Sequence, residues 1–108
     1  MIAIIYTVYD IQAKRAIQPL IRENDQIAAR DFEQLVATQK PFNNNPDDYV
    51  LYRIGQWDDE TMYIEPTDPK RIYTGLEALS NWQHRQAKLN QLQLDIEELK
   101  NPNAGGTD

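Results

Sequence analysis

Two strand-like segments lead directly into a helix with a readable start, and this order over residues 2–36 limits the possible folds more than any other feature. Residues 2–9 are rich in β-branched and aromatic side chains, which predicts a strand. Both alternating sets of its side chains are largely apolar, which indicates a central strand or one covered on its second face. Residues 15–22 predict a second strand, and because Pro19 cannot donate to a ladder, we expect an edge or a bulge there.

Asn24 and Asp25 mark the start of the helix, because either side chain can accept hydrogen bonds from the free N–H groups of a first helical turn. Apolar residues then recur at helical spacing, and this buried stripe comprises Ala28, Phe32, Leu35 and Val36. We expect the helix to end near Thr38, since Pro41 restricts the backbone of the residue before it.

The middle of the chain predicts a second hairpin. Residues 41–48 have the composition of a loop, and residues 49–57 predict a third strand in which Gly55 marks a bulge or a close backbone approach. Residues 61–65 predict the fourth strand, and residues 70–75 a connector.

Residues 1–75 therefore predict a single core domain of class α+β with the order β-β-α-β-β. Its two hairpins form a small antiparallel sheet, and the helix packs on one face of that sheet. Phe32 should be buried against Ile4 or Tyr6 and against the third strand.

A long C-terminal helix is predicted over residues 76–100, followed by a flexible tail at 101–108. Large apolar residues recur at heptad spacing and form a candidate oligomer interface, which comprises Trp82, Leu89, Leu92, Ile96 and Leu99. Arg85 interrupts this seam. The alternative is that Leu76, Leu79, Trp82 and Leu89 pack on the chain's own sheet, and we prefer this alternative for the first half of the helix.

The distal residues Leu92, Ile96 and Leu99 are expected to contact a partner, because a helix of roughly 25 residues spans near 37 Å and overhangs a sheet of short strands. The chain is therefore predicted to form a homodimer or a higher oligomer.

Composition argues against most catalytic and metal chemistry. The chain of 108 residues contains no cysteine and one histidine, His84, so neither a nucleophile–base pair nor a zinc cage can be assembled from the usual ligands. Its glycines lack the spacing of a phosphate-binding loop. We therefore expect no enzyme, no metal site and no cofactor. No apolar run approaches the roughly 20 residues that cross a bilayer, and the start of the chain lacks the features of a signal peptide.

A surface for single-stranded nucleic acid combines aromatic side chains with arginines along a sheet. The candidate residues on or beside the predicted strands are Tyr9, Tyr52, Trp57, Arg15, Arg22 and Arg53. Such aromatics are equally ordinary strand residues that pack in cores and across strands. The net charge of −6 disfavours binding to duplex DNA, which depends on many Lys and Arg side chains.

Two ordered motifs resemble a known family. The first has the run Ile5-Tyr6-Thr7-Val8-Tyr9-Asp10, then Pro19 before Asn24-Asp25, then Ala28-x-Arg30-x-Phe32. The second is Pro46-Asp47-Asp48-Tyr49-x-Leu51-Tyr52-x-Ile54-Gly55-x-Trp57-Asp58. Together they cover residues 4–66 and resemble the small nonstructural protein of gokushoviruses, single-stranded DNA phages of the microvirus family. The long C-terminal helix, and Gln26 where that family commonly has glycine, depart from its pattern.

The resemblance implies a protein of the host bacterial cytoplasm that is not part of the virion and acts at the stage of viral DNA synthesis or packaging. Such proteins are often labelled DNA-binding, so weak binding of single-stranded DNA by an oligomer is the first expectation. The alternative is a protein-interaction module that contacts a viral replication or capsid protein, or a host factor, without touching DNA. The acidic net charge favours this alternative, and the strand aromatics with their arginines favour DNA.

Overall fold

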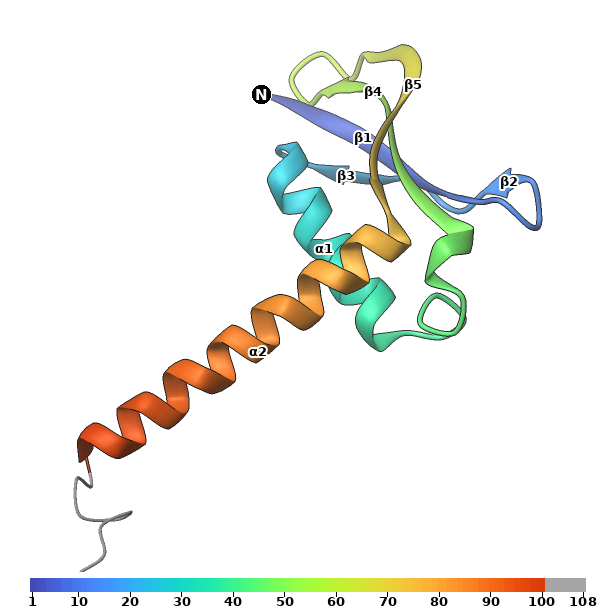
Figure 1. Ribbon diagram of the computed structural model, residues 1–108. Helices are drawn as coiled ribbons and strands as arrows, with labels where there is room; N and C mark the ends of the chain where they lie inside the picture. Colours follow the sequence, from blue (N-terminus) through green and yellow to red (C-terminus); the bar gives the residue numbers. More distant parts are fainter. Residues whose placement is uncertain (101–108) are drawn as a thin grey trace, which may run out of the picture.

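The computed structural model describes residues 1–100, and the tail predicted at 101–108 lies outside the described residues. Its elements in chain order are β1 (Ile2–Asp10), β2 (Arg15–Ala16), β3 (Leu20–Arg22), α1 (Asp25–Thr38), a 3₁₀ helix η1 (Pro46–Asp48), β4 (Tyr49–Asp58), β5 (Ile64–Thr74) and α2 (Gly75–Lys100). The described chain thus has an antiparallel sheet of five strands, one short helix and one long C-terminal helix (Figure 1). The predicted α+β class is confirmed.

The sheet has the order β2-β1-β4-β5, and β3 also pairs with β1. Of the two alternatives predicted for residues 2–9, the central strand is therefore confirmed. The second strand, predicted as one segment over 15–22, is instead two short segments separated at residues 17–19. Pro19 lies in this break, where the sheet requires no hydrogen bond from a backbone N–H at that position.

The last strand is longer than the sequence indicates. β5 begins at Ile64 and continues to Thr74, so the expected end after residue 65 and the expected connector at 70–75 are wrong. The strand passes through Pro66 and Pro69 because β5 lies at the sheet edge, where a residue without an N–H can be accommodated on the side that faces away from the ladder.

Gly55 of β4 confirms the predicted irregularity. The β1–β4 and β4–β5 registers both shift beside it, and a Cβ atom built on Gly55 would lie 2.7 Å from the backbone oxygen of Glu65. The glycine therefore permits the close approach of β5 to β4.

Helix α1 begins and ends where the sequence predicts. Asn24 is its N-cap, and the side-chain oxygen of Asn24 accepts a hydrogen bond of 2.9 Å from the backbone N–H of Ile27. Phe32 is only 3% exposed and lies in one core cluster with Tyr6 of β1 and Leu51 of β4, as expected. That cluster occupies the space between α1 and the sheet.

Helix α2 lies on the same side of the sheet as α1 and then projects away from the domain (Figure 1). Its first turns pack against α1 and η1, with Gly75 and Ala78 buried and Leu79 in contact with the core. Leu76 is 58% exposed, so the expectation that it packs on the chain's own sheet is wrong. Leu89 is 51% exposed, so the alternative that it packs there is not observed either. From residue 87 onward the whole helix is exposed, and the molecule extends 68 × 36 × 18 Å.

Candidate nucleic-acid interface

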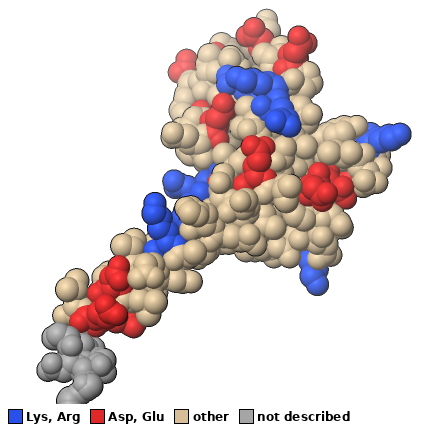
Figure 2. All heavy atoms as spheres, in the orientation of Figure 1, with Lys and Arg blue, Asp and Glu red and all other residues tan. Residues whose placement is uncertain are grey.

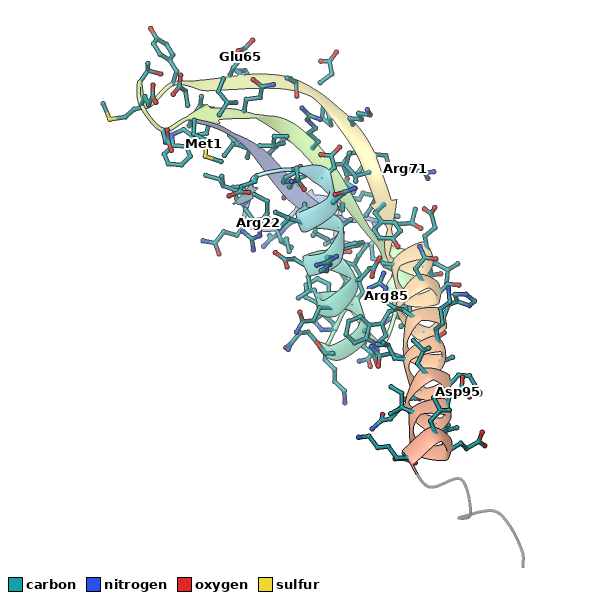
Figure 3. All side chains as sticks on the ribbon, turned by 90° about the vertical axis from the view of Figure 1, so that its left-hand side faces the viewer. Met1, Arg22, Glu65, Arg71, Arg85 and Asp95 are labelled. Atoms are coloured by element: carbon teal, nitrogen blue, oxygen red, sulfur yellow. The ribbon has the colours of Figure 1, made fainter. Side chains whose placement is uncertain are left out.

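One face of the sheet carries no helix from the described part of the chain, residues 1–100. Because α1 and α2 both contribute to the single core, the opposite face is left uncovered (Figures 1 and 3). Along β1, Tyr6 and Val8 point into the core, so the alternating residues Ile5, Thr7 and Tyr9 point to the uncovered face.

A shallow groove of about 390 Å³ lies on this face. It is lined by Thr7, Tyr9, Ala16, Tyr52, Ile54 and Pro69. The rings of Tyr9 and Tyr52 meet edge to face, with 6.3 Å between their centroids and 86° between their planes. The hydroxyl of Thr7 donates a hydrogen bond of 2.7 Å to the backbone oxygen of Ile17, so its polar group is already satisfied. The groove therefore offers mainly apolar and aromatic surface.

Trp57 lies on the same face but outside the groove. It is paired with Ala3 of β1 and with Ile64 of β5, towards the other end of the sheet. The structure thus brings together Tyr9 and Tyr52 and places Trp57 further along the same surface.

Arg71 supplies a positive charge beside the groove. It is the register partner of Tyr52 in the β4–β5 ladder, and its side chain points away from α1 (Figure 3). No carboxylate among residues 1–100 forms an ion pair with it. Sequence reasoning missed Arg71 because the segment that contains it was expected to be a connector.

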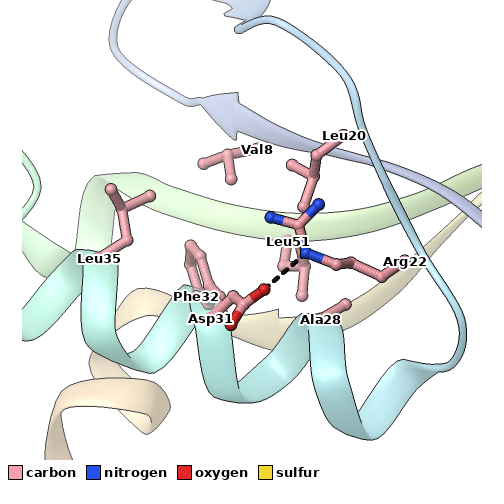
Figure 4. Close-up of a pocket in the computed structure, with 8 residues that line it drawn as sticks. All are labelled: Val8, Leu20, Arg22, Ala28, Asp31, Phe32, Leu35 and Leu51. Carbon is pink, nitrogen blue, oxygen red and sulfur yellow. Dashed lines mark hydrogen bonds and ion pairs between the residues drawn. The ribbon is translucent and has the colours of Figure 1, made fainter.

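Arg22 is turned to the helix side of the sheet. Its Nε lies 2.5 Å from Oδ2 of Asp31 on α1 (Figure 4). This ion pair flanks a small pocket of about 170 Å³ between β3 and α1, whose other lining residues are Val8, Leu20, Ala28, Phe32, Leu35 and Leu51. Arg22 is therefore separated from Tyr9 and Tyr52 by the sheet itself.

Arg53 also lies on the helix side, at the start of α1. Its Nη1 is 3.7 Å from Oδ2 of Asp25, while the hydroxyl of Tyr6 donates a hydrogen bond of 2.5 Å to Oδ1 of the same carboxylate. Burial, and then the hydrogen bond to Asp25, raise the pKa of Tyr6 above its ordinary value. The positive charge of Arg53 therefore compensates the carboxylate of Asp25, which also accepts the hydrogen bond from Tyr6.

Arg15 is exposed on the two-residue strand β2 and is the register partner of Asp10. Its neighbour Ala16 lines the groove, so by alternation Arg15 is directed to the other side of the sheet. Among the three arginines that the sequence suggested, none lines the groove.

Charged side chains of both signs are interspersed over the domain in the view of Figure 2, with one basic group near β4 and β5 and an acidic group on the distal part of α2. This distribution differs from the continuous basic stripe of a protein that coats duplex DNA.

The residues of the predicted oligomer interface differ in their exposure. Trp82 is half-buried, whereas Leu89, Leu92, Ile96 and Leu99 are between 50% and 81% exposed. The exposed part of the seam belongs to the projecting portion of α2.

Within residues 1–100, no group of three or more His, Asp or Glu side chains is arranged to hold a metal ion. No helix in this described part of the chain is long and apolar enough to cross a membrane.

The fold and the groove define a small α+β protein with one helix-covered sheet face, one open aromatic face and a projecting helix. Residues 3–78 match the family model described as Phage ORF5 protein, which covers most of the 108 residues. The chain therefore belongs to the Phage ORF5 protein family and is a phage protein. No curated protein and no solved structure matches the chain. The exposed part of α2 lies beyond the matched residues.

Proposed function

We propose that this phage protein is a non-enzymatic, nonstructural protein of the gokushovirus type that binds single-stranded DNA weakly, as a homo-oligomer, during viral single-strand synthesis or packaging. Its place of action is the cytoplasm of the bacterial host, outside the virion. Membership of the Phage ORF5 protein family and the two ordered motifs in residues 4–66 support the proposal.

The observation that carries the proposal is the pairing of the Tyr9–Tyr52 aromatic surface with Arg71 on the uncovered face. Unpaired bases stack on aromatic rings whatever their identity, while an arginine beside the ring can neutralise a backbone phosphate. Bases inside a duplex cannot reach such a surface, so the groove fits single strands.

In this proposal, Arg71 takes the role that the sequence analysis predicted for Arg15, Arg22 and Arg53. Arg22 and Arg53 compensate Asp31 and Asp25 on the helix side, so replacing them should affect stability before it affects binding. With few cations near the groove and a net charge of −6, affinity should be low.

Fluorescence anisotropy of a labelled oligothymidine at low salt tests the proposal. Tyr52→Leu keeps apolar volume but removes the stacking ring, and it should weaken binding on the order of tenfold, since one stacked base contributes about 1–3 kcal/mol. Arg71→Ala should also weaken binding. Arg30→Ala removes the same charge from an exposed position on α1 and should leave binding unchanged. Circular dichroism of each variant verifies that the fold is retained.

A protein-interaction module is the second candidate, and the apolar lining of the groove favours it. In that case the face would receive a segment of a viral replication or capsid protein, or of a host factor. Failure of the wild-type protein to bind the oligothymidine even at low salt would reject the DNA proposal and leave this one. Equal binding by wild type and Tyr52→Leu would remove the groove from the DNA proposal.

A further inference from the structure

The distal part of α2 presents an apolar stripe with no partner in the described chain. Every residue from 87 to 100 is exposed, although Leu89, Leu92, Ile96 and Leu99 recur on one side of the helix. The earlier positions of the same stripe belong to the part of α2 that is docked on the domain, because Trp82 is half-buried and Arg85 forms an ion pair with Glu33 of α1. The free seam therefore begins at Leu89.

We infer that this seam pairs in parallel and in register with α2 of a second copy of the chain, as a short two-stranded coiled coil. The inference rests on the self-association proposed above and specifies its geometry. In the heptad, Leu89 and Ile96 occupy the a positions, and Leu92 and Leu99 occupy the d positions. Ile96 at a, with Leu92 and Leu99 at d, matches the pattern of a β-branched residue at a and leucine at d that favours parallel two-stranded pairing.

The flanking charges favour the same direction. Asp95 occupies the g position and Lys100 the following e position, and these two positions lie side by side across a parallel pair. Asp95 of each copy therefore lies near Lys100 of the second copy. Antiparallel pairing of the four apolar residues would bring the two copies of Asp95 together, which repels. Leu94 is 56% exposed but lies outside the seam, at the f position.

Parallel pairing places both domains at the same end of the coiled coil, so that one DNA strand can engage two grooves. The seam from Leu89 to Lys100 is shorter than two heptads, and coiled coils usually need three or four. The dimer should therefore be weak on its own, and a strand bound to both domains should stabilise it by mass action.

Cysteine cross-linking gives a direct test, because the chain contains no cysteine. In a parallel pair in register, the same d residue from both copies meets at the axis, within the Cα separation that a disulfide requires. Under mild oxidation without DNA, Leu92→Cys and Leu99→Cys should each yield disulfide-linked dimer, on the order of fivefold more than the matched surface variant Leu94→Cys.

Equal cross-linking of Leu92→Cys and Leu94→Cys would overturn the inference. So would a disulfide that forms only when Leu92→Cys is mixed with Ile96→Cys, because that result identifies antiparallel pairing. Since this readout needs no DNA, cross-linking at Leu92 without oligothymidine binding would leave the parallel pair standing and reject the DNA function alone.

Discussion

Glu33 of α1 forms an ion pair with Arg85 of α2, with 2.5 Å between Oε1 and Nη2. The same carboxylate accepts a hydrogen bond of 2.7 Å from the hydroxyl of Tyr73 through Oε2, and that hydroxyl accepts one from the amide of Asn81. Glu33 is buried, and the Arg85 contact to its Oε1 is an ion pair by distance rather than an aligned hydrogen bond. Because the network joins α1, β5 and α2, it fixes the direction in which α2 leaves the domain.

Arg85→Ala should destabilise the protein, since it leaves the buried Oε1 of Glu33 without its cation. We expect a loss of about 1–3 kcal/mol in the free energy of unfolding, because an orphaned buried polar group retains its desolvation penalty. Urea denaturation measures the loss. Lys88→Ala, one turn further along the exposed part of α2, should stay within about 0.5 kcal/mol of wild type. A similarly small effect of Arg85→Ala would show that packing alone docks α2.

The sequence was sufficient to predict the fold class because its local signals agree with one another. The apolar composition of β1 predicts a strand, the N-cap at Asn24 predicts the start of α1, and the stripe that contains Phe32 gives α1 an apolar side that packs on the sheet. The full extent of β5 was missed because Pro66 and Pro69 signal a break, and only the position of β5 at the sheet edge makes them compatible with a strand.

The candidate site was predictable in part. Tyr9 and Tyr52 were identified from composition, but their grouping with Arg53 overlooked strand alternation, which turns adjacent residues such as Tyr52 and Arg53 to opposite faces. Arg71 could be found only from the ladder, since its position opposite Tyr52 depends on register shifts that the sequence does not reveal. The docking of α2 on α1 could not be predicted either, because it depends on contacts between residues far apart in the sequence, such as Glu33 and Arg85.

Phe32→Ala should cost roughly 3–5 kcal/mol in the free energy of unfolding, because it opens a cavity in the core. The centroids of the Phe32 and Tyr73 rings are 6.2 Å apart, so the change also removes a contact with β5. Phe32→Leu, which retains most of the volume, should cost clearly less. Thermal and urea unfolding provide the comparison, and a loss under about 1 kcal/mol for Phe32→Ala would contradict the observed docking of α1.

Gly75→Ala should be more destabilising than Gly55→Ala. A Cβ atom on Gly75 would lie 1.9 Å from the backbone oxygen of Pro46, whereas one on Gly55 would lie 2.7 Å from that of Glu65. Both obstacles are backbone atoms, so η1 or β5 must move, and overpacking of this kind typically costs about 1–3 kcal/mol. Urea midpoints of the two variants give the ranking. If Gly75→Ala proved as stable as the wild-type protein, the start of α2 would not be held against η1.

Stability should fall as the pH rises above about 10. Burial, and then the hydrogen bond to Glu33, raise the pKa of Tyr73 to about 12. An unfolded tyrosine titrates near pH 10, so between about pH 10 and 12 the unfolded chain releases a proton that the folded protein retains, and unfolding becomes easier. Below pH 10 both states are protonated and this contribution is fully present.

Tyr73→Phe should therefore reduce the loss of stability between about pH 10 and 12. The loss should not disappear, because the pKa of Tyr6 is also raised in the folded protein. Chemical denaturation at several pH values from 8 to 11 tests this, with Tyr63→Phe as a control because Tyr63 is 77% exposed. An identical pH dependence for wild type and Tyr73→Phe would argue that the hydroxyl of Tyr73 is equally solvated in both states.

Binding of single-stranded DNA should weaken with salt only moderately, because the groove has few neighbouring cations. Each phosphate contact should contribute roughly −0.7 to the slope of log K against log salt concentration, so a groove flanked by Arg71 should give a shallow slope. Arg71→Ala should reduce the magnitude of this slope by about 0.7, while Arg30→Ala should leave it unchanged. Anisotropy titrations between about 20 and 200 mM salt measure the three slopes. An unchanged slope for Arg71→Ala would mean that its guanidinium contacts no phosphate, and that the cation beside the bound strand must be sought elsewhere on the sheet.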